Sequence, residues 1–194
     1  MAIVHYLTHP QVQIDPDVPV PKWGLSPIGE ARAVAAARLP WAAGIGRIVS
    51  SDEVKAIETA RIFGARLGIR PQIREGMHEN DRSATGYLPP PQFEAMADRF
   101  FAEPEVSAEG WERAVDAQAR IVAAVEAVLA EEVEDGADRD LLLVGHGGVG
   151  TLLLCRLAGL PISRSRDQGP GGGNRFAFDR DTRAVLQGWT PFDA

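Results

Sequence analysis

The chain has 194 residues, 45% hydrophobic and 24% charged, which is typical of a globular protein with one buried core. Its formal net charge of −7 argues against a nucleic-acid-binding surface, which needs clustered Lys and Arg. A single cysteine excludes an internal disulfide and a thiolate metal cluster, and no leader-like segment or apolar run of about 18 residues is visible, so we expect a cytoplasmic protein outside the membrane.

The first half of the chain alternates strand-like and helix-like segments. This alternation predicts a three-layer α/β/α sandwich around a mostly parallel central sheet. In chain order we expect a strand at residues 3–7, a helix at 27–39, a strand at 47–50, a helix at 53–67 and a third strand at 69–74. Ser26 followed by Pro27 is typical of a capped helix start, and Ser51 or Asp52 is expected to cap the second helix.

The second half begins with a polar, turn-rich stretch. We expect one domain over residues 1–194, in which residues 75–110 form a lid insertion over the strand ends. The remaining predicted elements are helices at 91–102 and 110–134, a strand at 141–144, a helix at 149–158, and an edge hairpin formed by residues 174–179 and 184–189.

Two of the four histidines follow predicted strands. His9 comes after the apolar residues 2–7, and His146 comes after the apolar residues 141–145. In an open α/β sheet, ligands bind just beyond the carboxyl ends of the strands. The two imidazoles are therefore expected to face one bound group.

The glycine-flanked turn around His146 is suited to an anion. Backbone amides at a helix N-terminus bind negative charge, and Gly147 lets a phosphate approach closely. A neutral imidazole can attack phosphorus and form a phosphohistidine, which water then hydrolyses. That reaction needs donors around the phosphoryl oxygens and an acid for the leaving oxygen.

Three segments resemble the histidine phosphatase superfamily, the phosphoglycerate mutase-like proteins, in that family's order. The resembling segments are residues 25–29 (Leu-Ser-Pro-Ile-Gly), residues 50–60 for the family's Ser-Ser-x-x-x-Arg-Ala-x-x-Thr-Ala, and residues 144–148 around the second histidine. The resemblance implies a phosphatase that hydrolyses a small phosphorylated substrate, a phosphomonoester, without a metal or other cofactor. It further implies that His9 is the nucleophile, that His146 lies in the phosphate pocket and that Glu79 is the general acid.

The first motif departs from the family. Thr8 stands where the family has arginine, Pro10 where it has glycine, and Lys55 where it has a second phosphate-binding arginine. Lysine keeps the charge but loses the planar fork of donors. We expect Arg82 to compensate, with Lys22 and Arg175 as further candidates, so the predicted substrate-binding residues are Thr8, Lys55, Arg82 and Gly147.

Several alternatives stay open at this point. Glu75 and Asp81 are near enough to take the role of Glu79, and the departures at Thr8 and Lys55 allow a weak or inactive member that only binds a phosphorylated ligand. A mutase is a further alternative. Residues 145–150 also fit G-x-G-x-x-G, with Asp167 about twenty residues later, which would indicate a dinucleotide site. The sequence predicts neither the substrate's identity nor the oligomeric state.

Overall fold

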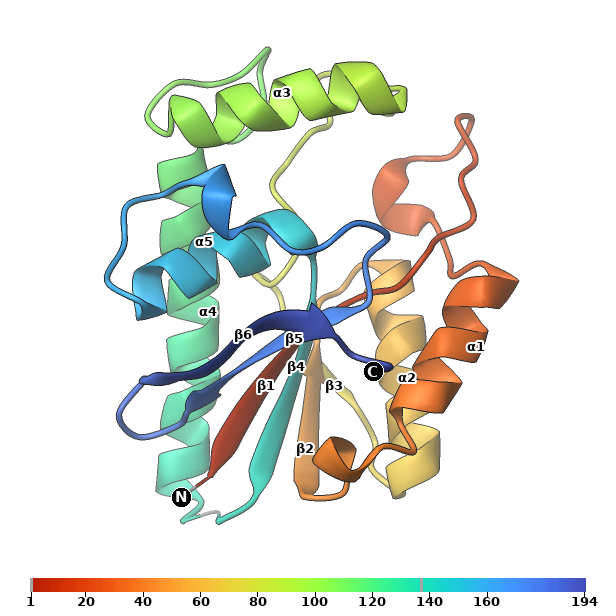
Figure 1. Ribbon diagram of the computed structural model, residues 1–194, viewed down its shortest axis with the longest axis vertical. Coiled ribbons are helices and arrows are strands. Elements are labelled where there is room, and N and C mark those ends of the chain that lie inside the picture. Colours follow the sequence, from red (N-terminus) through yellow and green to blue (C-terminus); the bar gives the residue numbers. More distant parts are fainter. Residues whose placement is uncertain (1, 137) are drawn as a thin grey trace.

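The computed structural model describes residues 2–136 and 138–194, which form three layers around one six-stranded sheet (Figure 1). The strands are β1 (Ile3–Thr8), β2 (Ile45–Ser50), β3 (Gln72–Ile73), β4 (Asp140–Gly145), β5 (Asn174–Asp179) and β6 (Val185–Pro191). The α-helices are α1 (Pro27–Ala36), α2 (Val54–Leu67), α3 (Pro90–Ala102), α4 (Ala114–Glu134) and α5 (Gly147–Leu157), with short 3-10 turns at Val20–Lys22, Pro40–Ala42 and Arg164–Arg166.

The sheet order is β3-β2-β4-β1-β5-β6. β1 to β4 run parallel, and β5 and β6 add an antiparallel hairpin at one edge, so the predicted mostly parallel sheet and edge hairpin are confirmed. The register places Thr8 beside Gly145 and Ser50 beside Val144. The three parallel strands that precede His9, Ser51 and His146 therefore end at the same level.

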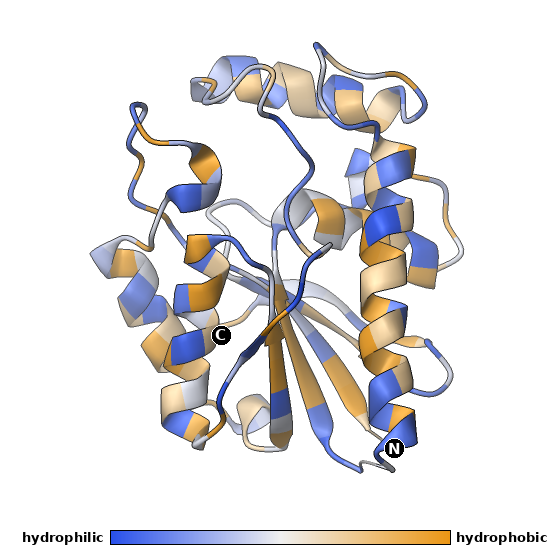
Figure 2. Cartoon of the chain, turned by 180° about the vertical axis from the view of Figure 1, so that it is seen from behind, coloured by the Kyte–Doolittle hydropathy of each residue, from blue (hydrophilic) through white to orange (hydrophobic). Residues whose placement is uncertain are grey.

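Two apolar clusters hold the layers together. One face of the sheet packs against α4 and α5 through Tyr6, Leu143 and Phe176, and the other packs against α1 and α2 through Leu7 and Val144. Neighbouring strand residues point to opposite faces, which is why buried strands of this sheet are continuous apolar runs. Figure 2 shows this distribution, with hydrophobic colouring concentrated on the central strands.

Several predicted boundaries were wrong by a few residues. α2 begins at Val54, with Glu53 in the cap position and no side-chain cap, rather than after a capping Ser51 or Asp52. The helix predicted from residue 110 begins at Ala114, because Glu109 and Gly110 both adopt positive φ and interrupt a helix there. The third strand shrinks to two residues. The predicted cap at Ser26 is confirmed, since its hydroxyl accepts the Gly29 N–H at 3.1 Å.

The segment predicted as a lid carries α3, which lies across the end of the molecule beyond the strand ends (Figure 1). Phe100 and Phe101 of α3 are buried with Trp111 in the larger apolar cluster. α3 is thus packed onto the domain, and its opening and closing stay a prediction. Over the described ranges, no helix is long and apolar enough to cross a membrane.

Candidate active site

His9 and His146 lie side by side at the carboxyl ends of β1 and β4. Their ring centroids are 5.3 Å apart, and the ring planes meet at 64°. His9 Nδ1 lies 2.9 Å from the Pro10 carbonyl oxygen. Because a carbonyl can only accept, Nδ1 carries the hydrogen and Nε2 keeps its lone pair. The tautomer of His9 is therefore the one that a nucleophile needs.

Both imidazoles are neutral near pH 7. Burial, followed by the positive charge of Lys55, lowers the pKa of His9 to about 4. Burial, with neighbouring His9 next, lowers the pKa of His146 well below its ordinary value. Neither ring carries the positive charge that would block nucleophilic attack.

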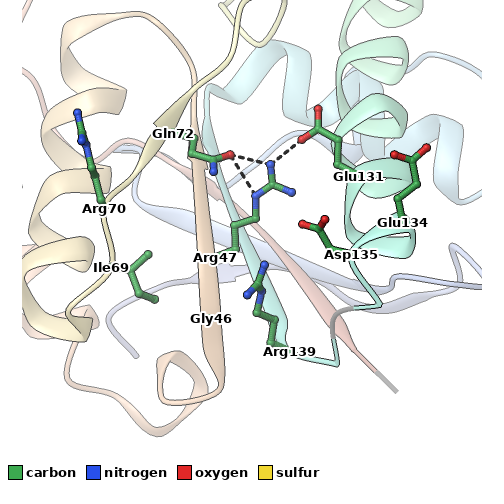
Figure 3. A pocket seen from close by; sticks show the side chains of 9 residues that line it. All are labelled: Gly46, Arg47, Ile69, Arg70, Gln72, Glu131, Glu134, Asp135 and Arg139. Carbon is green, nitrogen blue, oxygen red and sulfur yellow. Dashed lines mark hydrogen bonds and ion pairs between the residues drawn. The ribbon is translucent and has the colours of Figure 1, made fainter.

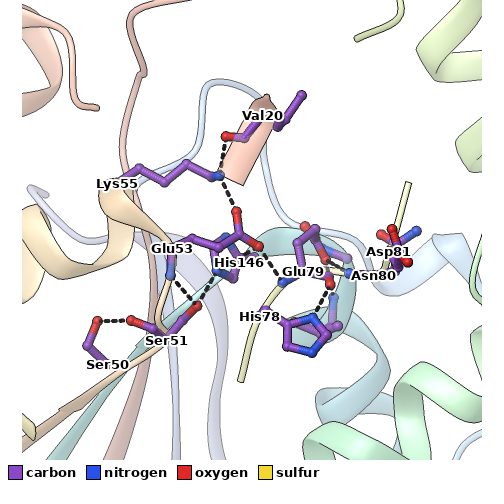
Figure 4. A network of polar contacts seen from close by, with 12 residues as sticks. Val20, Ser50, Ser51, Glu53, Lys55, His78, Glu79, Asn80, Asp81 and His146 are labelled. Carbon is purple, nitrogen blue, oxygen red and sulfur yellow. Dashed lines mark hydrogen bonds and ion pairs between the residues drawn. The ribbon is translucent and has the colours of Figure 1, made fainter. Parts of the chain in front are cut away.

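The ring of His146 is fully buried and held on one side only. Its Nε2 lies 2.8 Å from Ser51 Oγ, and its Nδ1 has no hydrogen-bond partner among the described residues (Figure 4). A buried polar atom without a partner is unfavourable, and a bound ligand would satisfy it. Nδ1 is thus the atom of this ring whose hydrogen-bonding capacity is unused among the described residues.

Glu79 reaches the site from the loop after β3. Its carboxylate accepts the Gly148 N–H at 3.0 Å and the Val149 N–H at 2.9 Å, so it lies on the first turn of α5. Burial alone would raise the pKa of Glu79, but the positive charge of Arg82 and these two backbone donors outweigh it and hold the pKa below its usual value. Glu79 is therefore ionised in the free protein. Of the alternative acids, Glu75 and Asp81 are exposed and do not line the cavity.

Glu53 is a residue of this site that the sequence did not predict. Its carboxylate contacts the Lys55 ammonium and accepts the Glu79 N–H at 2.9 Å, and its Oε1 lies 3.6 Å from His146 Nε2 (Figure 4). Lys55 also donates to the Val20 carbonyl at 3.0 Å. Burial would raise the pKa of Glu53, but the Lys55 charge lowers it overall, so the pair is ionic. In the family segment that residues 50–60 resemble, the position of Glu53 can hold any residue, so the resemblance assigned no role to it.

Of the other residues predicted to bind the anion, two line the cavity and one does not. Arg82 and Gly147 line the cavity, and the Arg82 guanidinium lies over the rings of Phe93 and Trp111 at 5.1 and 5.6 Å. Thr8 is buried and does not line it, because its hydroxyl is engaged by Gln168 and Asn174.

The two further cationic candidates were wrong. The Arg175 guanidinium lies over the Trp41 ring at 4.6 Å and donates to Gln187, away from the histidine pair. Lys22 is not among the residues that line the cavity. Neither of them therefore replaces an arginine of the family.

His9 lines a cavity of about 610 Å³, and the two residues that follow the buried His146, Gly147 and Gly148, line it as well. Apolar side chains form much of its wall, among them Trp23, Tyr87, Leu88, Phe93, Phe100 and Trp111. The wall's Arg164 is paired with Glu94 and Asp98. Within the part of the chain that the structure describes, no group of three His, Cys, Asp or Glu side chains could hold a metal ion.

A second cavity, of about 500 Å³, lies at the opposite end of the strands (Figure 3). Its central cation, Arg47, is already bound by Gln72, Glu131 and Glu132. The contacts of this guanidinium are those of a structural ion-pair network.

The sequence profile of the histidine phosphatase superfamily (branch 1) matches residues 7–189. The chain belongs to this superfamily. It is 31% identical to the glucosyl-3-phosphoglycerate phosphatase of Mycobacterium tuberculosis over 147 residues, which are 72% of this chain and 66% of that protein. The corresponding protein of Mycolicibacterium vanbaalenii is 31% identical over 163 residues, 78% of this chain and 68% of that protein.

Solved structures agree with the fold. The complex of the mycobacterial glucosyl-3-phosphoglycerate phosphatase with inorganic phosphate superimposes with a TM-score of 0.76 at 26% identity, covering 98% of this chain and 95% of that chain. YhfR of Bacillus stearothermophilus superimposes with a TM-score of 0.77 at 19% identity, over 96% and 95% of the two chains. The predicted superfamily and fold are confirmed, and the similar curated proteins are phosphatases, as the sequence led us to expect.

The dinucleotide alternative was wrong. After α5 the chain enters the antiparallel hairpin of β5 and β6 rather than a second parallel strand, which a dinucleotide-binding unit requires. Asp167 accepts a hydrogen bond from Thr151 at 2.9 Å. The glycines around His146 instead allow close contacts, since a Cβ on Gly148 would lie 2.7 Å from a Glu79 carboxylate oxygen.

Proposed function

We propose that this chain is a phosphomonoesterase that forms a phosphohistidine on His9. The observation that carries the proposal is the pairing of two neutral imidazoles, His9 with an unprotonated Nε2 and His146 with an unpartnered Nδ1, at the N-terminus of α5. A helix N-terminus stabilises an anion, and the two rings lie 5.3 Å apart beside that terminus. Membership of a phosphatase superfamily supports the same chemistry.

The first step breaks the ester bond. His9 Nε2 donates its electron pair to phosphorus, the P–O bond to the alcohol breaks, and the leaving oxygen takes a proton from the Glu79 carboxyl. Because Glu79 is ionised in the free protein, that proton arrives with the substrate, whose monoanion carries one. A phosphoryl anion beside Glu79 raises the pKa of this carboxyl, since like charges disfavour ionisation.

The second step regenerates the enzyme. Glu79, now a carboxylate, takes a proton from water as the water oxygen attacks phosphorus. The P–N bond to His9 breaks, its electron pair returns to Nε2, and inorganic phosphate leaves as the monoanion, taking the proton from Glu79 and returning that carboxylate to its ionised state. In our proposal the phosphoryl oxygens are held by Lys55, Arg82, the Gly147 N–H and His146 Nδ1.

The leaving alcohol occupies the apolar-walled cavity. The relatives are named for a phosphoglycerate ester, an acidic substrate, whereas Arg164 in this wall is already paired with Glu94 and Asp98. An apolar pocket binds an uncharged apolar body best. We therefore propose phosphomonoesters of bulky, uncharged alcohols as the substrate class.

Turnover of p-nitrophenyl phosphate tests the proposal. We expect activity in the parent protein, loss of at least a thousandfold in His9→Ala, and parent-like rates in the control His78→Asn, which replaces a histidine outside the cavity. ³¹P NMR of the alkaline-quenched enzyme should detect phosphohistidine. Vanadate binding without any turnover would instead support the inactive, ligand-binding alternative.

A further inference from the structure

We propose that Gln168 takes the place of the arginine that the family has before the first histidine, and that Thr8 is the positioning residue that aims it. In this proposal, which rests on the proposed function, the side-chain amide of Gln168 donates a hydrogen bond to the bound phosphoryl group. Gln168 comes from the loop between α5 and β5 and lines the catalytic cavity.

The hydrogen bonds determine which end of the Gln168 amide faces the cavity. Its Oε1 lies 2.7 Å from Thr8 Oγ1 and 3.1 Å from Asn174 Nδ2. Asn174 Nδ2 also lies 3.0 Å from the Gly169 carbonyl, which can only accept, so this end of Asn174 is the nitrogen. The facing atom of Gln168 must then be the oxygen. Its NH₂ group, on the other side, has no acceptor among the described residues.

The NH₂ group of Gln168 packs against the residue that follows the second histidine. A Cβ on Gly147 would lie only 2.1 Å from Gln168 Nε2, so only glycine leaves room for the amide there. The Gly147 N–H, first in α5, has no hydrogen-bond partner in the described part of the chain. Two unused donors therefore lie close together at Gly147, directly after His146, where the phosphoryl oxygens are expected in our proposal.

This arrangement explains why Thr8 is buried. Its hydroxyl donates toward Gln168 and accepts the Asn174 N–H at 3.0 Å, so it fixes the amide rather than touching the substrate. A hydroxyl on β1 and an amide on a distant loop together occupy the place of one long arginine. The amide donates an oriented hydrogen bond but carries no charge. Phosphoryl binding then depends more on oriented donors than on net positive charge.

Two substitutions at Gln168 test the role of its NH₂ group, with kcat/KM for p-nitrophenyl phosphate and the inhibition constant of inorganic phosphate as readouts. Gln168→Ala should lower kcat/KM and weaken phosphate binding about tenfold to a hundredfold, the effect of one hydrogen bond to a charged group. Gln168→Glu keeps the acceptor that Thr8 and Asn174 need but turns the donor into an anion. It should therefore be worse than Gln168→Ala.

A purely structural role predicts the opposite order. If Gln168 only held the loop, the acceptor retained in Gln168→Glu would restore function, so near-parent phosphate binding in that variant would overturn the proposal. Parent-like values in Gln168→Ala would also overturn it. Thermal unfolding of each variant distinguishes a local loss of affinity from a loss of folded protein.

The positioning role of Thr8 is tested by a double-mutant cycle. Thr8→Val keeps the shape and removes the hydroxyl, so it should weaken phosphate binding alone but add nothing in the Gln168→Ala background. Gly147→Ala, which displaces the amide, should behave in the same way. Additive effects would overturn the link between Thr8 and Gln168.

The proposed function can fail separately from this inference. If calorimetry shows that the parent binds inorganic phosphate but the parent hydrolyses no ester, the catalytic proposal is wrong. The role of Gln168 is then tested by the phosphate affinity of its variants alone. If the parent hydrolyses ester and Gln168→Ala does so equally well, only the present inference falls.

Discussion

Glu53 and Lys55 form a buried ion pair at the cavity that His9 lines, so the lysine that replaces a family arginine has its charge balanced from two residues away. Arg82 and Glu79 are a further cation and a further anion that line this cavity. With both histidines neutral, the formal charges of these four side chains cancel. In our proposal, a bound phosphoryl group therefore meets oriented donors and no net charge from these four side chains.

Removing the Glu53 charge should strengthen anion binding. In Glu53→Gln the amide still accepts from Lys55, but the lysine charge is no longer balanced, so inorganic phosphate should inhibit about tenfold more strongly. The free energy of unfolding should fall, because a buried lysine loses its counter-charge. Glu30→Gln, which removes an exposed charge on α1, is the matched control and should leave inhibition unchanged. Weaker inhibition in Glu53→Gln would mean that the carboxylate mainly orients Lys55.

The pH dependence of kcat/KM should be bell-shaped in the acid range. His9 must be neutral, so activity should fall as the pH drops through about 4. The reacting ester must bring a proton to ionised Glu79, so activity should also fall above about pH 6, near the second pKa of a phosphomonoester. For an ester with a lower second pKa, the alkaline limb of the kcat/KM profile should move to lower pH. An alkaline limb that stays in place for all esters would assign it to the protein.

His5 should make the protein sensitive to acid without affecting catalysis. The ring is buried beside Trp41, and neither of its nitrogens has a hydrogen-bond partner among residues 2–136 and 138–194. Burial, with Arg175 next, lowers the pKa of His5 to about 4 from an unfolded value near 6.5. The unfolded state therefore binds the proton first, and stability falls as the pH drops from about 6.5 to about 4.

His5→Phe should remove this part of the pH dependence. The expected gain in the free energy of unfolding near pH 4, relative to the gain at pH 8, is on the order of 3 kcal/mol. Urea unfolding of the parent and the variant at both pH values measures it. An equal change at the two pH values would show that packing, rather than protonation, governs this position.

The cavity wall should favour an apolar leaving group. We expect 2-phenylethyl phosphate to exceed glycerol phosphate and 3-phosphoglycerate in kcat/KM by about tenfold or more, since burying an aromatic ring contributes a few kcal/mol. Tyr87 lines the cavity, and the centroid of its ring lies 5.5 Å from that of the Trp23 ring. Tyr87→Ala should lower kcat/KM for the phenylethyl ester severalfold and leave glycerol phosphate unchanged. A preference for 3-phosphoglycerate would contradict the proposed substrate class.

Local patterns in the sequence were enough to predict the strand ends and the histidines that follow them. The apolar runs before His9 and His146 mark buried parallel strands, and parallel strands end at one edge of a sheet, so the two rings had to come near each other. Glu79 could also be proposed from its place after β3, although only the resemblance distinguished it from Glu75 and Asp81.

Glu53 and Gln168 depended on contacts that no local pattern encodes. Glu53 looks like an ordinary acidic residue at a helix start, and its role arises because the Glu79 loop donates to it and its partner Lys55 is held by the Val20 turn. Gln168 meets Thr8 across 160 residues of sequence. Strand direction follows from short-range hydrophobic periodicity, whereas the partner of a buried polar side chain follows from sheet register and loop path, which only the assembled tertiary structure decides.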